Sequence, residues 1–319
     1  MSQLILAIPS KGRLEEASAE IFAKAGLALK RDGARGYRGS LPGLPDVQVD
    51  YVSAGDIAAR LADGSLHMGI TGEDLLREEI LDMESAVQLC LPLGFGHADV
   101  VVAIPNGWVD ATTMYDLAEV AIEFRARHGR QMRVATKYTN LTADFFARRS
   151  VIDFELVASF GATEAAPNSG EAEAIVDITS TGATLAANDL RILEDGVILE
   201  SEANLVASLK ADWSSEARTA AKRILAQISA MQAGEQMMQL AFTAPAPPEQ
   251  LLDLDAALIH SVTPSGGAYS CSLVVPRGDF GDLRDALGQR GIAVIADTPK
   301  FIFAPDNNRA FERLSGALG

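Results

Sequence analysis

Two α/β lobes with a cleft between them, followed by a small α+β domain, form the architecture that this sequence predicts. The chain opens with a continuous apolar run at residues 4–8, a Pro-Ser-Lys-Gly turn and a helical pattern over residues 14–25. A short buried strand followed by a helix is the unit of a parallel sheet. The pattern recurs as far as residue 209 and changes after a long helical stretch at 213–231. Recurrence over that length favours two lobes, and the change marks a further domain.

The elements of the two lobes follow from the apolar periodicity. Strand patterns occupy residues 4–8, 47–52, 67–70, 87–93, 98–104, 132–136, 154–157, 174–178 and 197–209. Helical patterns occupy residues 14–25, 56–61, 73–81, 112–128, 141–149 and 183–193. Residues 31–45 are rich in Gly, Arg and Pro, so we expect a loop there. The strands at 87–93 and 98–104 are joined through two glycines and mark a crossing into the second lobe.

The C-terminal part has a different order of elements. Strand patterns lie at residues 236–242, 258–262, 268–275 and 292–295, with a helical pattern at 280–290. This order and length predict a small ferredoxin-like α+β domain. The domain boundaries that we expect are therefore 1–95 and 180–215 for lobe I, 96–179 for lobe II, and 225–319 for the C-terminal domain.

Composition excludes several classes of partner. The chain has 319 residues, of which 48% are hydrophobic, and a net charge of −16 from 27 basic and 43 acidic residues. A field of that sign repels phosphate backbones, which argues against nucleic acid and acidic membrane surfaces as partners. The N-terminal apolar run has no basic region before it and is too short for a signal peptide, and no stretch approaches a membrane span. We expect a cytoplasmic protein whose anionic ligands are held by local groups.

Cysteines and histidines give no sign of a metal site or a catalytic triad. Cys90 and Cys271 lie far apart in sequence, and two buried free thiols in a reducing compartment are expected rather than a disulfide. The four histidines form no cluster with zinc-ligand spacing and no triad with a nucleophile, so we expect packing or surface roles. His97 follows Gly94 and Gly96 at the lobe crossing and is a candidate for the cleft wall.

The informative segment for function begins on the strand pattern at 174–178. Side chains alternate along a strand, so Glu173 and Asp177 share one face. The carboxylate of Asp177 suits ribose hydroxyls or a magnesium-bound diphosphate, because it would repel a phosphate directly. The chain then turns at Gly182, a residue that tolerates conformations that others resist. The helix expected from Ala183 would point its free N–H groups at a phosphate.

We call residues 177–184 the cradle, and predict that it holds a ribose 5-phosphate. Besides Gly182 and the N–H of Ala183, its expected ligand groups are the hydroxyls of Thr179, Ser180, Thr181 and Thr184. The alternative is that Ser180 or Thr181 simply caps a helix that follows a buried strand. The two acidic residues on the preceding strand favour the ligand site over the cap.

The cradle resembles the phosphoribosyl-diphosphate loop of ATP phosphoribosyltransferases, the first enzymes of histidine biosynthesis. The matching pattern is acid-x-x-x-Asp-x-x-(Ser/Thr)-Thr-Gly-x-Thr-Leu at residues 173–185. Three further segments resemble that family in the same order: K-G-R-L at 11–14, D-G followed by M-G-I-T-G-E-D at 63–74, and R-V-A-T-K-Y-T-N at 133–140. The resemblance covers residues 1–210, and the combination is far more specific than any one motif.

This resemblance implies roles for residues outside the cradle. It makes Asp177, Lys11 and Arg13 the catalytic set, with the two basic side chains contacting phosphates or nucleotide. The further substrate-binding residues that it implies are Glu173, Gly72, Glu73, Asp74, Lys137, Tyr138, Asn140 and Glu164. Ordinary alternatives are a solvated turn for Lys11 and Arg13, and helix capping for Glu73 and Asp74. Around Glu164 the sequence departs from the family, since Asn168 stands where an Arg is common.

The resemblance also implies a reaction and its partners. The family condenses ATP, through N1 of adenine, with phosphoribosyl diphosphate, giving phosphoribosyl-ATP and diphosphate with Mg²⁺ as cofactor. It implies two lobes of the periplasmic-binding-protein kind and a C-terminal regulatory domain, ACT-like, that binds L-histidine through residues including Ser261 and Thr263. Ordinary strand and turn chemistry is the alternative for that pair. The end of the chain departs from the family's pattern. A homo-oligomer, a hexamer by resemblance, is expected.

Two other functions fit parts of this pattern. A two-lobed solute-binding receptor or sensor without catalysis would share the architecture, but the absence of an export signal opposes it. Another phosphoribosyltransferase with a different acceptor would share the cradle, but the N-terminal motifs oppose it.

Overall fold

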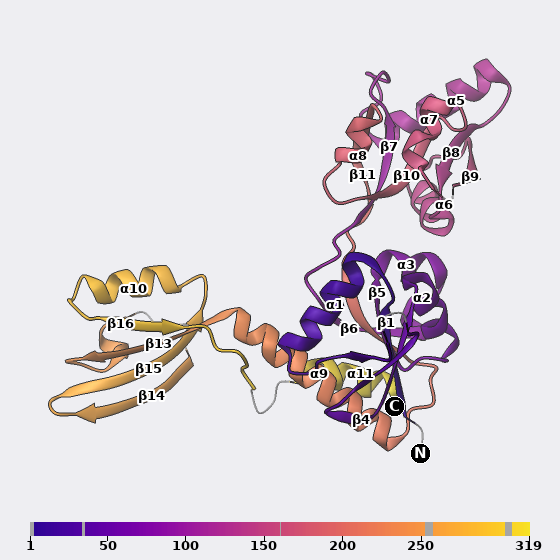
Figure 1. The fold of residues 1–319 in the computed structure, drawn as a ribbon. Helices are drawn as coiled ribbons and strands as arrows, with labels where there is room; N and C mark the ends of the chain where they lie inside the picture. The colour runs from indigo at the N-terminus through magenta and orange to yellow at the C-terminus, as the bar shows by residue number, and fades with distance from the viewer. Residues whose placement is uncertain (1–2, 34–35, 160, 253–257, 304–307) are drawn as a thin grey trace. The chain divides into compact units, whose positions relative to one another are not determined.

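The computed structural model describes residues 3–33, 36–159, 161–252, 258–303 and 308–319. The chain divides into two compact units (Figure 1). The first unit comprises Met1–Glu20, Leu29–Ala220 and Arg313–Gly319, and the second comprises Ile21–Ala28 and Ala221–Glu312. Among the described residues, no helix is both long and apolar enough to cross a membrane. The predicted α/β class, with two sheet-based lobes and a small C-terminal sheet domain, is confirmed.

The first sheet of the first unit is built around the N-terminal strand β1 (Leu4–Pro9). β1 pairs in parallel with β4 (Leu44–Val52) and β5 (Met68–Gly72), as expected for buried apolar strands. The sheet order is β2-β3-β4-β1-β5-β12-β6, and the remaining strands are β2 (Lys30–Arg31), β3 (Arg38–Leu41), β6 (Val87–Pro92) and β12 (Ala203–Ser208). Its helices are α1 (Gly12–Lys24), α2 (Ala54–Asp63), α3 (Glu73–Glu79) and α4 (Met83–Ala86). The loop expected at 31–45 was wrong, because antiparallel pairing with β4 turns part of it into strand.

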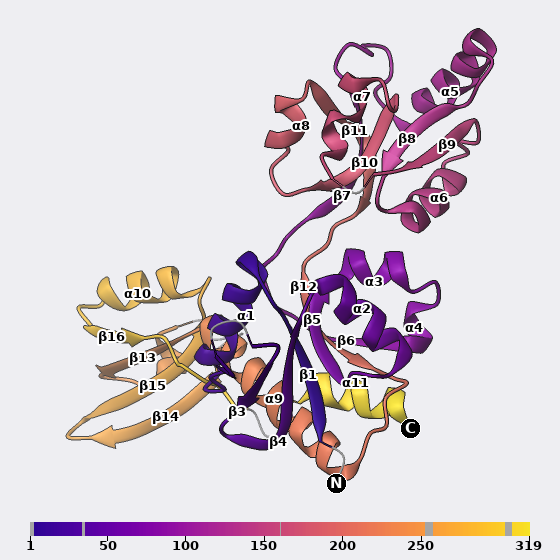
Figure 2. The ribbon, with the colours of Figure 1, turned by 45° about the vertical axis from the view of Figure 1, so that its right-hand side comes forward.

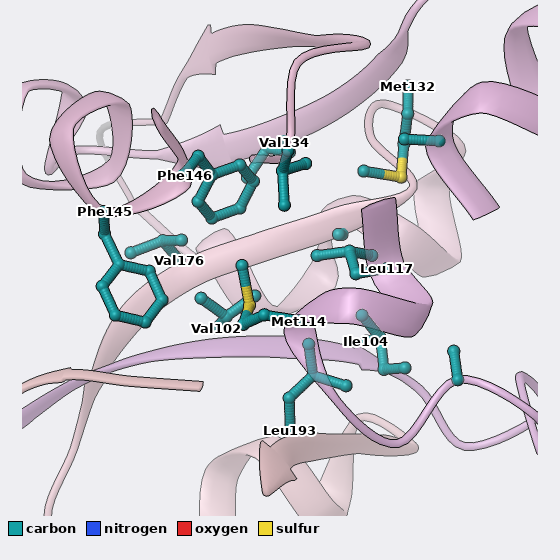
Figure 3. Close-up of a cluster of buried hydrophobic side chains, with 14 of the residues drawn as sticks. Val102, Ile104, Met114, Leu117, Met132, Val134, Phe145, Phe146, Val176 and Leu193 are labelled. Carbon is teal, nitrogen blue, oxygen red and sulfur yellow. The ribbon is translucent and has the colours of Figure 1, made fainter. Parts of the chain in front are cut away.

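The second sheet has the order β11-β7-β10-β8-β9. Its strands are β7 (Asp99–Pro105), β8 (Met132–Thr136), β9 (Phe154–Ala158), β10 (Ala174–Thr179) and β11 (Leu190–Leu199). Its helices are α5 (Met114–His128), α6 (Thr139–Arg148), the 3-10 turn η1 (Thr163–Ala165), α7 (Ala166–Ser169) and α8 (Ala183–Ala187). Figure 3 shows Val102, Val134 and Val176 of this sheet among side chains of α5 and α6.

The boundary between the lobes lies later in the chain than the sequence predicted. Residues 197–209 were expected to form one strand, and lobe II was expected to end at 179. The structure instead divides that stretch between two sheets, because β11 pairs with β7 and β12 pairs with β5 and β6. The second sheet therefore includes β11 and continues to Leu199. Apolar periodicity cannot separate two consecutive strands that enter different sheets.

The second unit contains a four-stranded antiparallel sheet. Its order is β14-β15-β13-β16, which is the ferredoxin-like order, and α10 (Phe280–Gly288) lies along one face (Figure 2). The strands are β13 (Met237–Ala244), β14 (Leu258–Ser265), β15 (Ala268–Pro276) and β16 (Val294–Asp297). Between β13 and β14, where that fold has its first helix, the described residues form only the short turn η2 (Pro248–Gln250). Leu240, Phe242 and Leu273 form its core with Leu287 of α10.

Three helices of the described chain cross from one unit to the other, the first being α1 at residues 20–21. The long helix α9 (Ser215–Glu235) passes from the first unit into the second at residues 220–221. The last helix, α11 (Arg309–Leu318), returns to the first unit, where the Arg313 guanidinium donates to the carbonyl of Cys90 over 2.8 Å. The C-terminal domain expected at 225–319 is therefore too long at its end, because Arg313–Gly319 belong to the first unit. Cys90 and Cys271 are buried free thiols, as predicted, and burial raises the pKa of Cys90 to about 12.

His67 is a packing histidine, as the sequence analysis expected. It is buried just before β5, and its Nδ1 accepts a hydrogen bond from the Ile5 N–H over 3.1 Å. Its Nε2 donates to the Asp212 carbonyl over 3.1 Å, and its ring packs edge-on against Trp213. This pattern of partners assigns the neutral tautomer with the proton on Nε2. His67 thus ties β1 to the segment before α9.

Replacing His67 should destabilise the first unit. His67→Phe keeps an aromatic ring but leaves the Ile5 N–H and the Asp212 carbonyl without partners, so we expect a loss of about 2 kcal/mol. Urea unfolding followed by tryptophan fluorescence measures this loss. The control is His128→Phe, an exposed position at the end of α5 that should change stability by less than about 0.5 kcal/mol. Equal stabilities of the two variants would contradict the role given to His67.

Candidate active site

The cradle lines a cavity of about 660 Å³ in the first unit. The cavity walls come from three parts of the chain: the start of α1, the crossing between the sheets, and the cradle. Arg13 and Leu14 come from α1, and Phe95 and His97 come from the crossing. The cradle contributes Thr179, Ser180, Thr181 and Thr184. Two motifs more than 160 residues apart in sequence, K-G-R-L and the cradle, thus meet at one cavity, with Lys11 exposed in the turn before Arg13.

Strand pairing explains why these parts meet. β10 runs antiparallel to β7, and Thr179 at its end lies opposite Asp99 at the beginning of β7. The crossing residues before Asp99 therefore lie beside the first residues after Thr179. Gly96 in the crossing has φ +68°, and a Cβ built on it would lie 2.7 Å from Cδ2 of Leu14. Glycine is needed there because it allows the crossing to approach α1 closely.

The cradle is shaped by its own hydroxyl groups. The N–H of Gly182 donates to Oγ1 of Thr179 over 2.7 Å, and Gly182 has φ +73°, which favours glycine. Among the described residues, no hydrogen bond occupies the hydroxyls of Ser180 and Thr184, which both line the cavity. The helix predicted at 183–193 was wrong in its length, because α8 ends at Ala187 and β11 begins at Leu190. So short a helix has little dipole, so the hydroxyls are the larger source of hydrogen-bonding groups on this wall of the cavity.

Asp177 lies near the end of β10, and Lys137 follows directly after the neighbouring parallel strand β8. β8 pairs with β10 so that Thr136 lies opposite Val176, and the next residues in each chain are Lys137 and Asp177. Burial raises the pKa of Asp177, while the hydrogen bond from the Ile178 N–H and the charge of Lys137 lower it, and Glu164 on η1 raises it. The charges of Lys137 and Glu164 therefore both act on the carboxylate of Asp177, in opposite directions.

Asp74 and Tyr138 are buried against each other. The Tyr138 hydroxyl donates to Oδ2 of Asp74 over 2.6 Å, and the Ser201 hydroxyl donates to Oδ1 over 2.9 Å. Burial, followed by the charge of Asp74, raises the pKa of Tyr138 well above its ordinary value, so the phenol is the donor. Only 7% of Asp74 and 1% of Tyr138 is exposed. Both were predicted to bind substrate, and the structure gives each of them a protein partner.

Asn140 is likewise engaged by protein. Its backbone N–H donates to the carboxylate of Glu78, and its side-chain Nδ2 donates to the Glu78 carbonyl over 2.8 Å. Sequence analysis missed Glu78, whose buried carboxylate also accepts from Leu141. Its only signal was its spacing of four residues from Asp74, which places both carboxylates on one face of α3.

Glu173 lies at the far end of β10 from the cavity. It precedes Ala174, and Asp177 is four residues further, about 13 Å along a strand. Its carboxylate accepts hydrogen bonds from the side chains of Arg130 and Arg133 at 2.8 Å and from the Arg133 N–H. Burial opposes ionisation, but these three donors outweigh it and hold the pKa of Glu173 at about 2. Glu173 thus anchors the beginning of β10.

Of the remaining predicted residues, His97 lines the cavity, whereas Gly72, Glu73, Ser261 and Thr263 do not. Gly72 precedes α3, and Glu73 in its first turn pairs with Arg77 over 2.6 Å, one helical turn away, so it forms an ion pair and not a helix cap. Ser261 and Thr263 are exposed on β14 in the second unit, opposite serines of β15. His97 lies on the cavity, as its place in the crossing suggested. Across the described residues, no group of three or more His, Cys, Asp or Glu side chains is arranged to hold a metal ion.

Comparisons with known proteins agree with one another. A family model described as HisG, ATP phosphoribosyltransferase, matches residues 53–230. The ATP phosphoribosyltransferase of Rhodopseudomonas palustris strain HaA2 is 49% identical over 319 residues, which is 98% of each chain. That of Nitrobacter winogradskyi is 52% identical over 274 residues, covering 86% of this chain and 84% of the relative. The solved ATP phosphoribosyl transferase (HisG:HisZ) complex from Thermotoga maritima superposes with TM-score 0.55 and 26% identity, covering 71% of this chain and 96% of that one.

The ion pairs of Glu173 should make stability depend on pH. Its folded pKa, about 2, lies below its ordinary value of 4.5, so its contribution is complete above about pH 5 and disappears as pH falls through about 2. Because Arg130 is partly exposed, we expect Glu173→Gln to lose about 2 kcal/mol at pH 7, and the loss to shrink by more than half near pH 3. Urea unfolding at the two pH values measures it. The neighbouring exposed Glu171→Gln is the control, and a loss independent of pH would contradict this account.

Proposed function

Because the chain belongs to the ATP phosphoribosyltransferase family, we propose that it condenses ATP with phosphoribosyl diphosphate. N1 of adenine attacks C1 of the ribose, the bond from C1 to the diphosphate oxygen breaks, and the electron pair of that bond leaves with the diphosphate. The products are phosphoribosyl-ATP and diphosphate, the first step of L-histidine biosynthesis. The observation that carries this proposal is the single cavity lined by Arg13 and by the unoccupied hydroxyls of the cradle.

Groups that line the cavity, and two groups beside it that do not line it, Asp177 and Lys137, suit the parts of phosphoribosyl diphosphate. The hydroxyls of Ser180, Thr181 and Thr184, with Arg13, can hold the 5-phosphate by hydrogen bonds and charge. Asp177, at the end of the same strand, can accept hydrogen bonds from the ribose hydroxyls. Lys137, just after the neighbouring strand β8, can offset the negative charge that grows on the leaving diphosphate. No side chain forms a covalent bond in this scheme, so catalysis consists of positioning and charge stabilisation.

The donor set also fits a magnesium ion that binds with its substrate. Mg²⁺ typically takes one or two carboxylates and completes its shell with substrate phosphates and water. Asp177 and Glu164 are the carboxylates available here, since the charge of Glu164 acts on Asp177. When bound, Mg²⁺ would supply positive charge that stabilises the leaving diphosphate. Lys11, in the turn after β1, is the group we propose to contact the nucleotide phosphates of ATP, while Arg13, in the first turn of α1, serves the 5-phosphate.

We further propose that the second unit regulates the enzyme. Its four-stranded sheet would bind L-histidine through residues that include Ser261 and Thr263, and the effector would reduce turnover. A homo-oligomer, hexameric as the resemblance implies, is the proposed assembly, and the cytoplasm is the proposed location.

A diphosphate-release assay tests the proposed reaction. The purified chain with ATP, phosphoribosyl diphosphate and Mg²⁺ should release diphosphate, and omitting ATP should abolish the release. No release with both substrates would contradict the function and would favour a receptor without catalysis. Adding L-histidine should lower the rate, and Ser261→Ala with Thr263→Ala should weaken that inhibition. A rate that histidine does not change would contradict the regulatory proposal alone.

Replacing Asp177 should slow the reaction. Asp177→Ala removes the proposed ribose contact, and we expect turnover to fall at least about tenfold, which corresponds to about 1.4 kcal/mol of transition-state stabilisation. Steady-state kinetics with both substrates saturating measure the loss. Asp144→Ala, on the exposed side of α6, is the matched control in the same lobe and should keep its activity. Unchanged kinetics of Asp177→Ala would contradict its assignment.

A further inference from the structure

Helix α6 begins without a cap from its own segment. The residue before it, Tyr138, has φ −101° and ψ 66°, and its side chain makes no capping hydrogen bond. The first N–H groups of a helix have no acceptor within the helix and need one from elsewhere. Here the need is acute, because Leu141 and Thr142 in the first turn are buried.

Glu78, on a helix that packs with the first sheet (α3), supplies acceptors for the first N–H groups of α6. Its Oε1 accepts from the Asn140 N–H over 3.0 Å, and its Oε2 accepts from the Leu141 N–H over 3.0 Å. The hydroxyl of Thr139 donates to Oε1 over 3.1 Å. Only 8% of Glu78 is exposed. A buried carboxylate is costly unless it is neutralised, and the N–H donors and the positive end of α6 neutralise this one.

A second carboxylate of α3 binds Tyr138, the residue before α6. Asp74, one turn before Glu78 on α3, accepts the hydroxyl of Tyr138. The Tyr138 N–H in turn donates to Oγ1 of Thr136 over 2.9 Å. Lys137 therefore lies between two residues whose positions are fixed, although its own side chain is exposed. Its ammonium lies 4.9 Å from the centre of the Tyr138 ring and lowers the pKa of Asp177.

We infer that Glu78 is a positioning residue for phosphoribosyl diphosphate. By capping α6 it fixes the turn between β8 and α6, and the turn sets where Lys137 stands relative to Asp177 and the cradle. Glu78 itself touches no substrate in this scheme. The inference rests on the proposed function, in which Lys137 faces the diphosphate, and it adds a link between α3 and that site.

The test compares two adjacent glutamates of α3. Glu78→Gln removes the charge and turns an amide N–H₂ toward the helix N–H groups, whereas Glu79→Gln changes an exposed side chain. We expect Glu78→Gln to raise KM for phosphoribosyl diphosphate at least tenfold and to lower kcat, because a displaced Lys137 also offsets less of the charge that grows on the diphosphate, with KM for ATP changing less than threefold. Glu79→Gln should match the wild-type chain. Calorimetric binding of phosphoribosyl diphosphate without ATP should show the same loss of affinity for Glu78→Gln.

A double-mutant cycle separates positioning from general destabilisation. If Glu78 acts through Lys137, Glu78→Gln should weaken binding at least tenfold in the wild-type background but less than twofold in a Lys137→Ala background. Equal effects in both backgrounds, or none in either while the wild-type chain is active, would overturn the inference. If the wild-type chain itself releases no diphosphate, the proposed function fails instead.

A milder variant covers the case in which Glu78→Gln does not fold. Thr139→Val keeps the shape of the side chain and removes only the hydroxyl that donates to Glu78. It should raise KM for phosphoribosyl diphosphate about threefold, and this increase should also disappear with Lys137→Ala. An unchanged KM for Thr139→Val, when Glu78→Gln cannot be purified folded, would overturn the inference.

Discussion

The register of β10 is the constraint on which the candidate site depends. β10 lies in the interior of the second sheet, antiparallel to β7 on one side and parallel to β8 on the other. The antiparallel register brings the end of β10 to the beginning of β7, so the cradle lies beside the crossing residues. The parallel register brings Lys137 beside Asp177. A slip of one residue would turn Asp177 to the opposite face of the sheet and separate the carboxylate from this edge.

Carboxylates in this acidic chain fall into two groups according to their partners. Glu173, Asp74 and Glu78 each face donors from the protein, namely two arginines, two hydroxyls, and the first turn of α6. Within the part of the chain that the structure describes, Asp177 has only the N–H of the residue that follows it as donor, with the charge of Lys137 nearby. Burial without matching donors raises the pKa of Asp177, whereas the arginines lower that of Glu173. The first group stabilises the fold, and Asp177 keeps oxygen lone pairs for a ligand.

Sequence analysis predicted the parts of the site that depend on local pattern. A strand followed by hydroxyls and a glycine predicted the cradle, and the turn after β1 predicted a basic residue at the same cavity. Period-two alternation placed Glu173 and Asp177 on one strand face, but β10 begins at Ala174, so Glu173 precedes the strand and only Asp177 lies on it. Alternation also carries no information on which end of a strand meets a ligand. The extent of α8 and the split between β11 and β12 also depend on which sheet each segment joins. Those choices are set by contacts distant in sequence.

Glu78 and Glu79 show most clearly where local pattern ends. They are adjacent glutamates on one helix, with the same helix propensity and the same charge, so neither property distinguishes them. Rotation of about 100° per residue along a helix turns one toward α6 and the other to solvent. Glu78 accepts hydrogen bonds from the first N–H groups of α6. That helix lacks a cap of its own, because the residue before it is Tyr138, whose side chain makes no capping hydrogen bond. A missing cap in one segment and a surplus carboxylate 60 residues earlier are each unremarkable alone. Together they imply a contact, because buried N–H groups in native proteins are almost always paired.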